Sequence, residues 1–103
     1  MKLVQKNLVA ITDVGVGQEQ FDAVIKEADK QIAKWGVQTH TPFEWAVFTG
    51  EECGELQKAI ADHYYGRTKG IQDVIEEAIQ TATLCLKIAK MYADCEDFDR
   101  EAI

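Results

Sequence analysis

Three glutamates stand within five residues of the chain, at Glu51, Glu52 and Glu55 in the stretch FTGEECGELQKA. On a helix, residues three or four positions apart are neighbours, with Cβ atoms roughly 5–6 Å apart. Glu52 and Glu55 therefore lie together, and Glu51 is also next to Glu55. Two carboxylates about 5 Å apart repel by roughly 3 kcal/mol at an effective dielectric near 20. Carboxylates crowded in this way protonate, face solvent or hold a cation.

A second polar pair follows in the apolar stretch DVIEEAIQTATL, where Glu77 and Gln80 are three residues apart. Two helices that each turn such a pair toward a shared interior form a cage of oxygen ligands, as in the metal sites of helical bundles. Oxygen ligands favour a hard ion, so we expect Mg²⁺ or Mn²⁺ rather than zinc. The alternative is that the first group of glutamates lies on a solvated helix face. The four candidate ligands are Glu52, Glu55, Glu77 and Gln80.

The composition is that of one ordinary globular domain of 103 residues, with 47% hydrophobic and 28% charged residues. The net charge of -7 argues against nucleic acids and anionic membranes as partners, because both need a surplus of Lys and Arg. An acidic excess instead suits a protein that holds divalent cations. No stretch reaches the roughly 18–20 apolar residues of a membrane span, and no signal peptide is recognisable. We therefore expect a cytoplasmic protein.

Apolar periodicity and helix caps predict an all-α chain. Apolar residues recur at three- and four-residue steps from Gln18 to Trp35, which indicates an amphipathic helix that ends at Gly36. The segment TPFE, beginning at Thr41, is a capping box with proline at the first helical position. It predicts a second helix that runs to about His63. A third long helix is expected to start near residue 71 or 72.

The two ends of the chain give weaker patterns. Residues 1–16 are the least helical part, and they form either a short strand or an extended arm. Residues 17–103 are the expected helical domain. The tail EDFDREAI forms either a short fourth helix or a frayed end.

The third predicted helix is apolar nearly all round between Ala82 and Tyr92, where Lys87 and Lys90 are its only charges. A helix of this kind is buried nearly all round. Because a chain this small cannot cover one helix on every side, the surplus apolar face predicts a subunit interface.

Two longer stretches, KWGVQTHTPFEWAVFTGEECGELQKA and IQDVIEEAIQTATLCLKIA, resemble the MazG-like members of the all-α nucleoside triphosphate pyrophosphohydrolase superfamily. That superfamily is marked by E-E-x-x-E on one helix and E-x-x-D on the next long helix. The chain has E-E-x-x-E at residues 51–55 and E-x-x-Q at residues 77–80, so glutamine replaces the usual aspartate. Residues 34–40 also match the K-W-G-x-Q-x-H segment of a short MazG-like subgroup. The resemblance covers about residues 28–91.

The resemblance implies an antiparallel helical bundle that assembles as a homodimer or homotetramer. It implies cleavage between the α- and β-phosphates of a nucleoside triphosphate, of a non-standard or surplus kind, giving a monophosphate and pyrophosphate. Glu52, Glu55 and Glu77 match metal-binding acids, whereas the neutral amide of Gln80 should bind metal more weakly. Glu51 is the candidate catalytic residue, because it either ligates a metal or orients the attacking water. The candidate substrate-binding residues are Lys34, Trp35, Gln38, His40 and Lys58.

Other interpretations stay open. Gln80 favours a non-catalytic helical module that binds a nucleotide or a protein partner without turnover. A pyrophosphohydrolase acting on a phosphoribosyl nucleotide of histidine synthesis is a further alternative, although the K-W-G-x-Q-x-H segment argues against it. Trp35 either stacks on a base or fills the core, and His40 either contacts substrate or caps a turn. Trp45 is expected to be core rather than a ligand.

Overall fold

The computed structural model describes residues 10–67 and 70–95, and within those ranges it contains three helices and no strand. The helices are α1 (Gln18–Trp35), α2 (Pro42–Tyr64) and α3 (Gln72–Ala93). The predicted all-α class is confirmed, and the helix bounds predicted above agree with these to within one residue. Residues 10–17 are exposed and outside any helix. Most of the predicted arm, residues 1–9, and the tail EDFDREAI lie outside the described residues.

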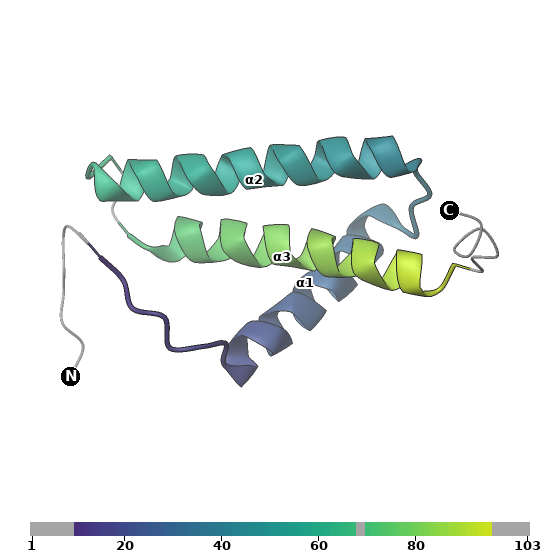
Figure 1. Cartoon of the computed structure of the whole chain (residues 1–103), viewed down its shortest axis with the longest axis horizontal. Coiled ribbons are helices and arrows are strands. Elements are labelled where there is room, and N and C mark those ends of the chain that lie inside the picture. Colours follow the sequence, from purple (N-terminus) through teal and green to yellow (C-terminus); the bar gives the residue numbers. More distant parts are fainter. Residues whose placement is uncertain (1–9, 68–69, 96–103) are drawn as a thin grey trace, which may run out of the picture.

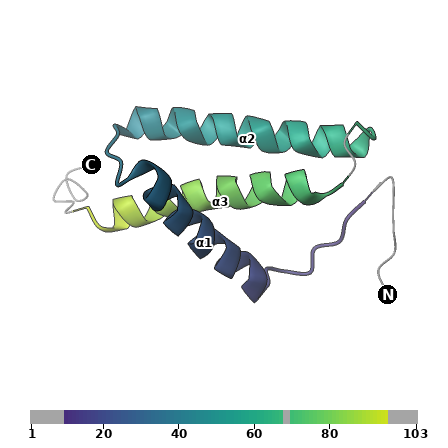
Figure 2. The same cartoon turned by 180° about the vertical axis from the view of Figure 1, so that it is seen from behind.

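The helix α3 is the central element of the fold. Helices α2 and α3 run antiparallel and side by side, and α1 crosses α3 diagonally on one side of that pair (Figures 1 and 2). α3 packs against both other helices, whereas the backbones of α1 and α2 do not pack against each other. Side chains of α1 and α2 that point toward each other therefore lie over α3, which contacts both helices.

The connection between α1 and α2 is defined by a glycine and a capping box. Gly36 has a φ of 75°, and its N–H donates to the carbonyl of Ile32 at 2.8 Å, which ends α1. At the start of α2, the backbone N–H of Glu44 donates to Thr41 Oγ1 at 3.2 Å, and the N–H of Thr41 donates to Glu44 Oε1 at 2.9 Å. The predicted capping box is confirmed, and it fixes where the chain enters α2.

The single chain has a very small core. Among the described residues, Leu84 is the only buried hydrophobic side chain and Thr83 the only buried polar one. On α3, Leu86 is 51% exposed, and on α1 the side chain of Ile25 is 63% exposed. The apolar face predicted to be in surplus on the third helix is thus uncovered in one copy of the chain. None of the three described helices is long and apolar enough to cross a lipid bilayer.

Candidate metal and nucleotide site

At the interface between α2 and α3, two carboxylates each have one oxygen that is buried and accepts no hydrogen bond from the described residues. The Thr81 hydroxyl lies between the two helices, with Oγ1 2.7 Å from the carbonyl oxygen of Glu77 and 3.2 Å from that of Glu52. One carboxylate oxygen of each of these glutamates, Oε2, is buried and has no hydrogen-bond partner among the described residues. A buried polar atom without a partner costs about 1–3 kcal/mol, and more when it is charged. A proton or a cation at the buried oxygen would therefore stabilise each carboxylate.

Burial and neighbouring negative charge act together on these two groups. Burial is the main cause that raises the pKa of Glu52 above 4.5, and the carboxylates of Glu77, Glu55 and Glu27 add to it. Burial also raises the pKa of Glu77, and among the neighbouring charges Glu55 contributes most. Glu55 is itself exposed, but its charge acts on both partly buried carboxylates. Three glutamates of the predicted metal set are thus electrostatically coupled.

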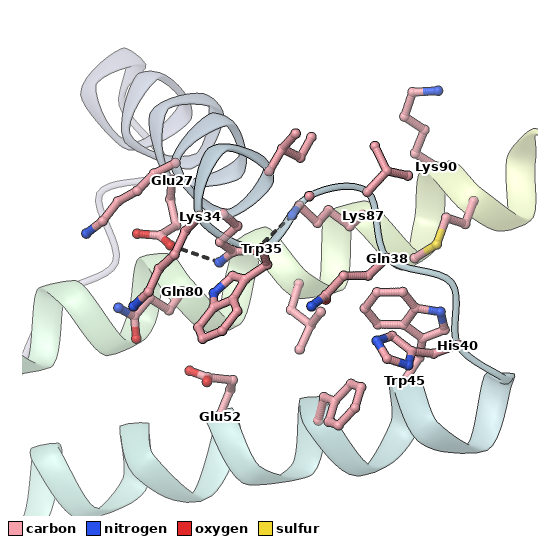
Figure 3. A pocket seen from close by; sticks show the side chains of 18 of the residues that line it. Glu27, Lys34, Trp35, Gln38, His40, Trp45, Glu52, Gln80, Lys87 and Lys90 are labelled. Carbon is pink, nitrogen blue, oxygen red and sulfur yellow. Dashed lines mark hydrogen bonds between the residues drawn. The ribbon is translucent and has the colours of Figure 1, made fainter.

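A cavity of about 830 Å³ opens beside Glu52 (Figure 3). Its walls come from α1 and the segment that follows it, from the first half of α2, and from α3. The volume lies within the range of about 300–1,000 Å³ that is typical of small-molecule sites. Glu52 belongs to the cavity wall as well as to the carboxylate pair, so it connects the two features. The predicted site residues that line the cavity are Lys34, Trp35, Gln38, His40, Glu51, Glu52 and Gln80.

One end of the cavity is aromatic and well packed. The rings of His40, Trp45 and Phe48 meet edge to face, with His40 4.9 Å from each of the other two centroids. Nδ1 of His40 is 3.9 Å from Glu44 Oε2, so the imidazole lies beside the capping box. Trp35 stands at the cavity edge with 62% of its surface exposed, which excludes a core role in the single chain. Its indole offers a flat face on which a base can stack.

Other predicted site residues lie apart from the cavity. Glu77 lies at the α2–α3 interface, and Glu55 is exposed on α2. Lys58 is paired with Asp62, its Nζ donating at 2.9 Å, and it does not line the cavity. Within residues 10–67 and 70–95, no three His, Cys, Asp or Glu side chains form a group able to hold a metal ion. Of the four predicted metal ligands, Glu52 and Gln80 line the cavity.

The cavity also has polar lining residues that the motif did not predict, above all Glu27, Gln31 and Lys87. Glu27 and Gln31 are spaced four residues apart, and Trp35 follows four residues later on the same face of α1. On α3, Lys87 follows Gln80 by seven residues and so shares its face. Their helical spacing from Trp35 and Gln80 could have predicted that all three residues share a face with those two site residues.

The chemistry of Glu52, Glu77 and Gln80 suits a hard divalent cation. Carboxylate and amide oxygens are the ligands that Mg²⁺ and Mn²⁺ prefer, and a cation between Glu52 and Glu77 would offset both buried charges. The adjoining cavity offers lysines that attract phosphate and aromatic rings that accept a base. Such a site can hold a metal-bound, negatively charged aromatic ligand.

Comparison of the chain with known proteins found no relative. No protein-family model, no curated protein and no solved structure matches it.

Proposed function

We propose that this chain is a Mg²⁺-dependent nucleoside triphosphate pyrophosphohydrolase of the MazG-like kind. The observation that carries the proposal is the position of Glu52. It has a buried oxygen without a donor, it is coupled to Glu77, and it lines the 830 Å³ cavity. The two sequence motifs that resemble the superfamily contain both glutamates, which adds to this argument.

In this proposal Glu52 and Glu77 hold the cation, and Glu55 and Gln80 complete its oxygen ligands. When bound, Mg²⁺ would neutralise phosphate charge and lower the pKa of a coordinated water. Glu51, exposed at the rim of the cavity, orients the attacking water and accepts its proton. Water adds to phosphorus, the bond between the α- and β-phosphates breaks, and a monophosphate and pyrophosphate leave.

The remaining cavity residues account for recognition of the nucleotide. Trp35 and the His40–Trp45–Phe48 cluster offer surfaces for the base, and Gln38 offers both a donor and an acceptor to its polar edge. Lys34, whose Nζ lies 4.8 Å from the centroid of the Trp35 ring, places a positive charge beside the stacking surface. A base of non-standard structure is accommodated because the cavity is open rather than closely fitted.

The direct test is an assay of pyrophosphate release from a panel of standard and modified nucleoside triphosphates with Mg²⁺ or Mn²⁺. We expect metal-dependent release from at least one of them, with the monophosphate as the second product. Glu52→Gln should abolish it, whereas Asp29→Asn, which removes an exposed carboxylate on the outside of α1, should not. Absence of release from every substrate at high protein concentration would reject the proposal.

A second candidate function is binding of a nucleotide or a protein partner without turnover. Gln80 favours it, because a neutral amide stands on the cavity wall where the superfamily motif has an aspartate. Replacing it by Gln80→Asp separates the two functions. If the parent is inactive and the variant hydrolyses nucleotides, the natural protein is a binding module.

We also propose that the active form is a homodimer or homotetramer. Supporting this, only one hydrophobic side chain of the described residues is buried, while Ile25, Ile32 and Leu86 are about half exposed or more. A core this small is insufficient for a stable domain of about 100 residues. Light scattering coupled to size-exclusion chromatography should give at least twice the chain mass of 11.6 kDa. A stable, folded monomer at micromolar concentration would contradict it.

A further inference from the structure

Three side chains form a continuous hydrogen-bonded chain along one wall of the cavity (Figure 3). Lys87 on α3 donates from Nζ to Gln31 Oε1 on α1 at 2.8 Å. Gln31 in turn donates from Nε2 to Glu27 Oε2 at 2.8 Å. The residues of this chain come from both helices of the wall, and all three line the cavity.

The chemistry of the two ends fixes the orientation of the amide between them. An ammonium group can only donate and a carboxylate can only accept, so the oxygen of Gln31 faces Lys87 and its nitrogen faces Glu27. The amide thereby links the two charges through neutral dipoles. Lys87 is thus held against α1 by a neutral partner, which does not compensate its positive charge.

Lys87 differs from the other lysines that line the cavity in its burial, because Lys30, Lys34 and Lys90 are exposed. Its side chain is partly buried, and no carboxylate lies within 4.0 Å of its ammonium in the described part of the chain. By contrast, the ammonium of Lys90 pairs with Asp94, and Lys34 lies over the Trp35 ring. An uncompensated ammonium in a cavity is a preferred partner for an anion, because partial removal from water strengthens the attraction.

The position of Lys87 on α3 matches a ligand that also reaches Gln80 and Glu52 in the same cavity. Gln80 and Lys87 are seven residues apart on one helix face, which corresponds to about 10 Å along the axis. Both line the same cavity. A ligand with several phosphate groups can therefore reach the metal-type donors at one position and the ammonium at the other.

We propose that Lys87 binds a phosphate group of the polyphosphate ligand, and that Gln31 is a positioning residue which holds the Lys87 ammonium in the cavity. The assignment rests on the proposed function only in naming the ligand as the substrate's polyphosphate. The sequence motif did not include either residue. Glu27 anchors the far side of the amide and keeps Gln31 in the required orientation.

The test is calorimetric titration of the full chain with inorganic tripolyphosphate in the presence of Mg²⁺. Lys87→Met keeps the aliphatic stem and removes the charge, and we expect it to weaken binding about tenfold or more. Lys87→Arg should stay within about threefold of the parent. Lys26→Gln, an exposed lysine on α1 that does not line this cavity, is the charge-matched control and should change binding less than twofold. If Lys87→Met does not fold, Lys87→Gln replaces it.

The positioning role of Gln31 is tested by binding and kinetic constants, which a purely structural role would not change selectively. Gln31→Met should raise the dissociation constant for tripolyphosphate several-fold and raise KM for the hydrolysed nucleotide by a similar factor, with kcat nearly unchanged. A fall in kcat with unchanged KM would overturn the positioning role. The melting temperature of each variant without ligand shows whether the fold is retained.

The outcomes distinguish this inference from the proposed function. If the parent binds tripolyphosphate but hydrolyses no nucleotide, and Lys87→Met loses that binding, the phosphate site stands and the hydrolase proposal fails. If the parent hydrolyses nucleotides and Lys87→Met keeps both its KM and its affinity for tripolyphosphate, the hydrolase stands and Lys87 has no role in binding. A parent that does not bind tripolyphosphate also overturns the inference.

Discussion

Polar side chains at the start of α2 have hydrogen-bond partners, whereas a polar side chain in the middle of the helix lacks one among the described residues. At its start, the Thr41 and Glu44 side chains each accept a hydrogen bond from the other's backbone, and His40 packs on Trp45 and Phe48. The Thr41 backbone N–H lowers the pKa of Glu44, as expected for a carboxylate with a donor. In the middle of the helix, burial instead raises the pKa of Glu52, and its Oε2 lacks a donor.

This difference separates polar groups that stabilise the fold from polar groups that are available for function. The start of α2 is complete within the single chain and adds to its stability. The buried oxygens of Glu52 and Glu77 have no partner among the described residues, and this should reduce stability unless a cation or a proton is supplied. Polar groups retained at such a cost are typical of functional sites. The predictions below separate the two regions further.

The largest expected effect is on catalysis. Glu52→Gln should lower nucleotide hydrolysis about a hundredfold or more, equivalent to at least ~2.7 kcal/mol of transition-state stabilisation. The same variant should unfold at a higher temperature than the parent in metal-free buffer, because a buried charge is gone. Opposite signs for activity and stability identify a functional group. A variant that keeps full activity would remove Glu52 from the site.

Metal ions should stabilise the middle of α2 specifically. With free Mg²⁺ at 100 times its dissociation constant, the free energy of unfolding should rise by about 2.7 kcal/mol. For a chain of this size the melting temperature should increase by roughly 10 °C or more. Glu77→Gln should remove at least half of this shift, whereas the control Asp29→Asn should keep it. A melting curve unchanged by saturating Mg²⁺ or Mn²⁺ would place the glutamates outside any metal site.

Removing the N-terminal cap of α2 should lower stability without changing activity or the response to metal. Thr41→Ala removes the acceptor for the Glu44 N–H, and urea denaturation should show a loss of about 1 kcal/mol. Hydrolysis per folded molecule and the Mg²⁺-induced shift in melting temperature should remain those of the parent. If Thr41→Ala also abolished the metal shift, the two regions would not be independent.

The smallest expected effect is on the pH dependence of stability. Because Glu52 and Glu77 have pKa values raised above 4.5 in the folded chain, the folded state binds more protons than the unfolded state just above that pH. Their stabilising contribution is therefore present below about pH 4.5 and is lost as pH rises through the raised values. In metal-free buffer the parent should lose more stability on this rise than the double variant Glu52→Gln/Glu77→Gln. Parallel pH profiles would contradict the raised pKa values.

Local signals in the sequence were sufficient to predict the helices. Gly36, the capping box at Thr41 and the apolar periodicity each act within a few residues, and the structure confirms the bounds that they predicted. The same spacing rule predicted that Glu52 and Glu55 are neighbours. Local rules of this kind do not depend on how the helices are rotated against one another.

The composition of the cavity depends on that rotation and was only partly predictable. The motif residues Glu51, Glu52 and Gln80 line it, whereas Glu55 and Glu77 do not. The apolar periodicity of α1 includes Ile25 and Ile32, yet these side chains are 63% and 48% exposed, while the polar Gln31 meets α3. Periodicity places Gln31 on the same helix face as Trp35, but it does not show that this face meets Lys87 on α3.

The most direct measurement is the anomalous diffraction of a crystal soaked in Mn²⁺, recorded at the manganese absorption edge. We predict a peak between α2 and α3 within about 2.0–2.3 Å of carboxylate oxygens of both Glu52 and Glu77. A peak bound only by exposed carboxylates such as Glu51, or no peak at saturating Mn²⁺, would contradict a shared metal ion at this interface.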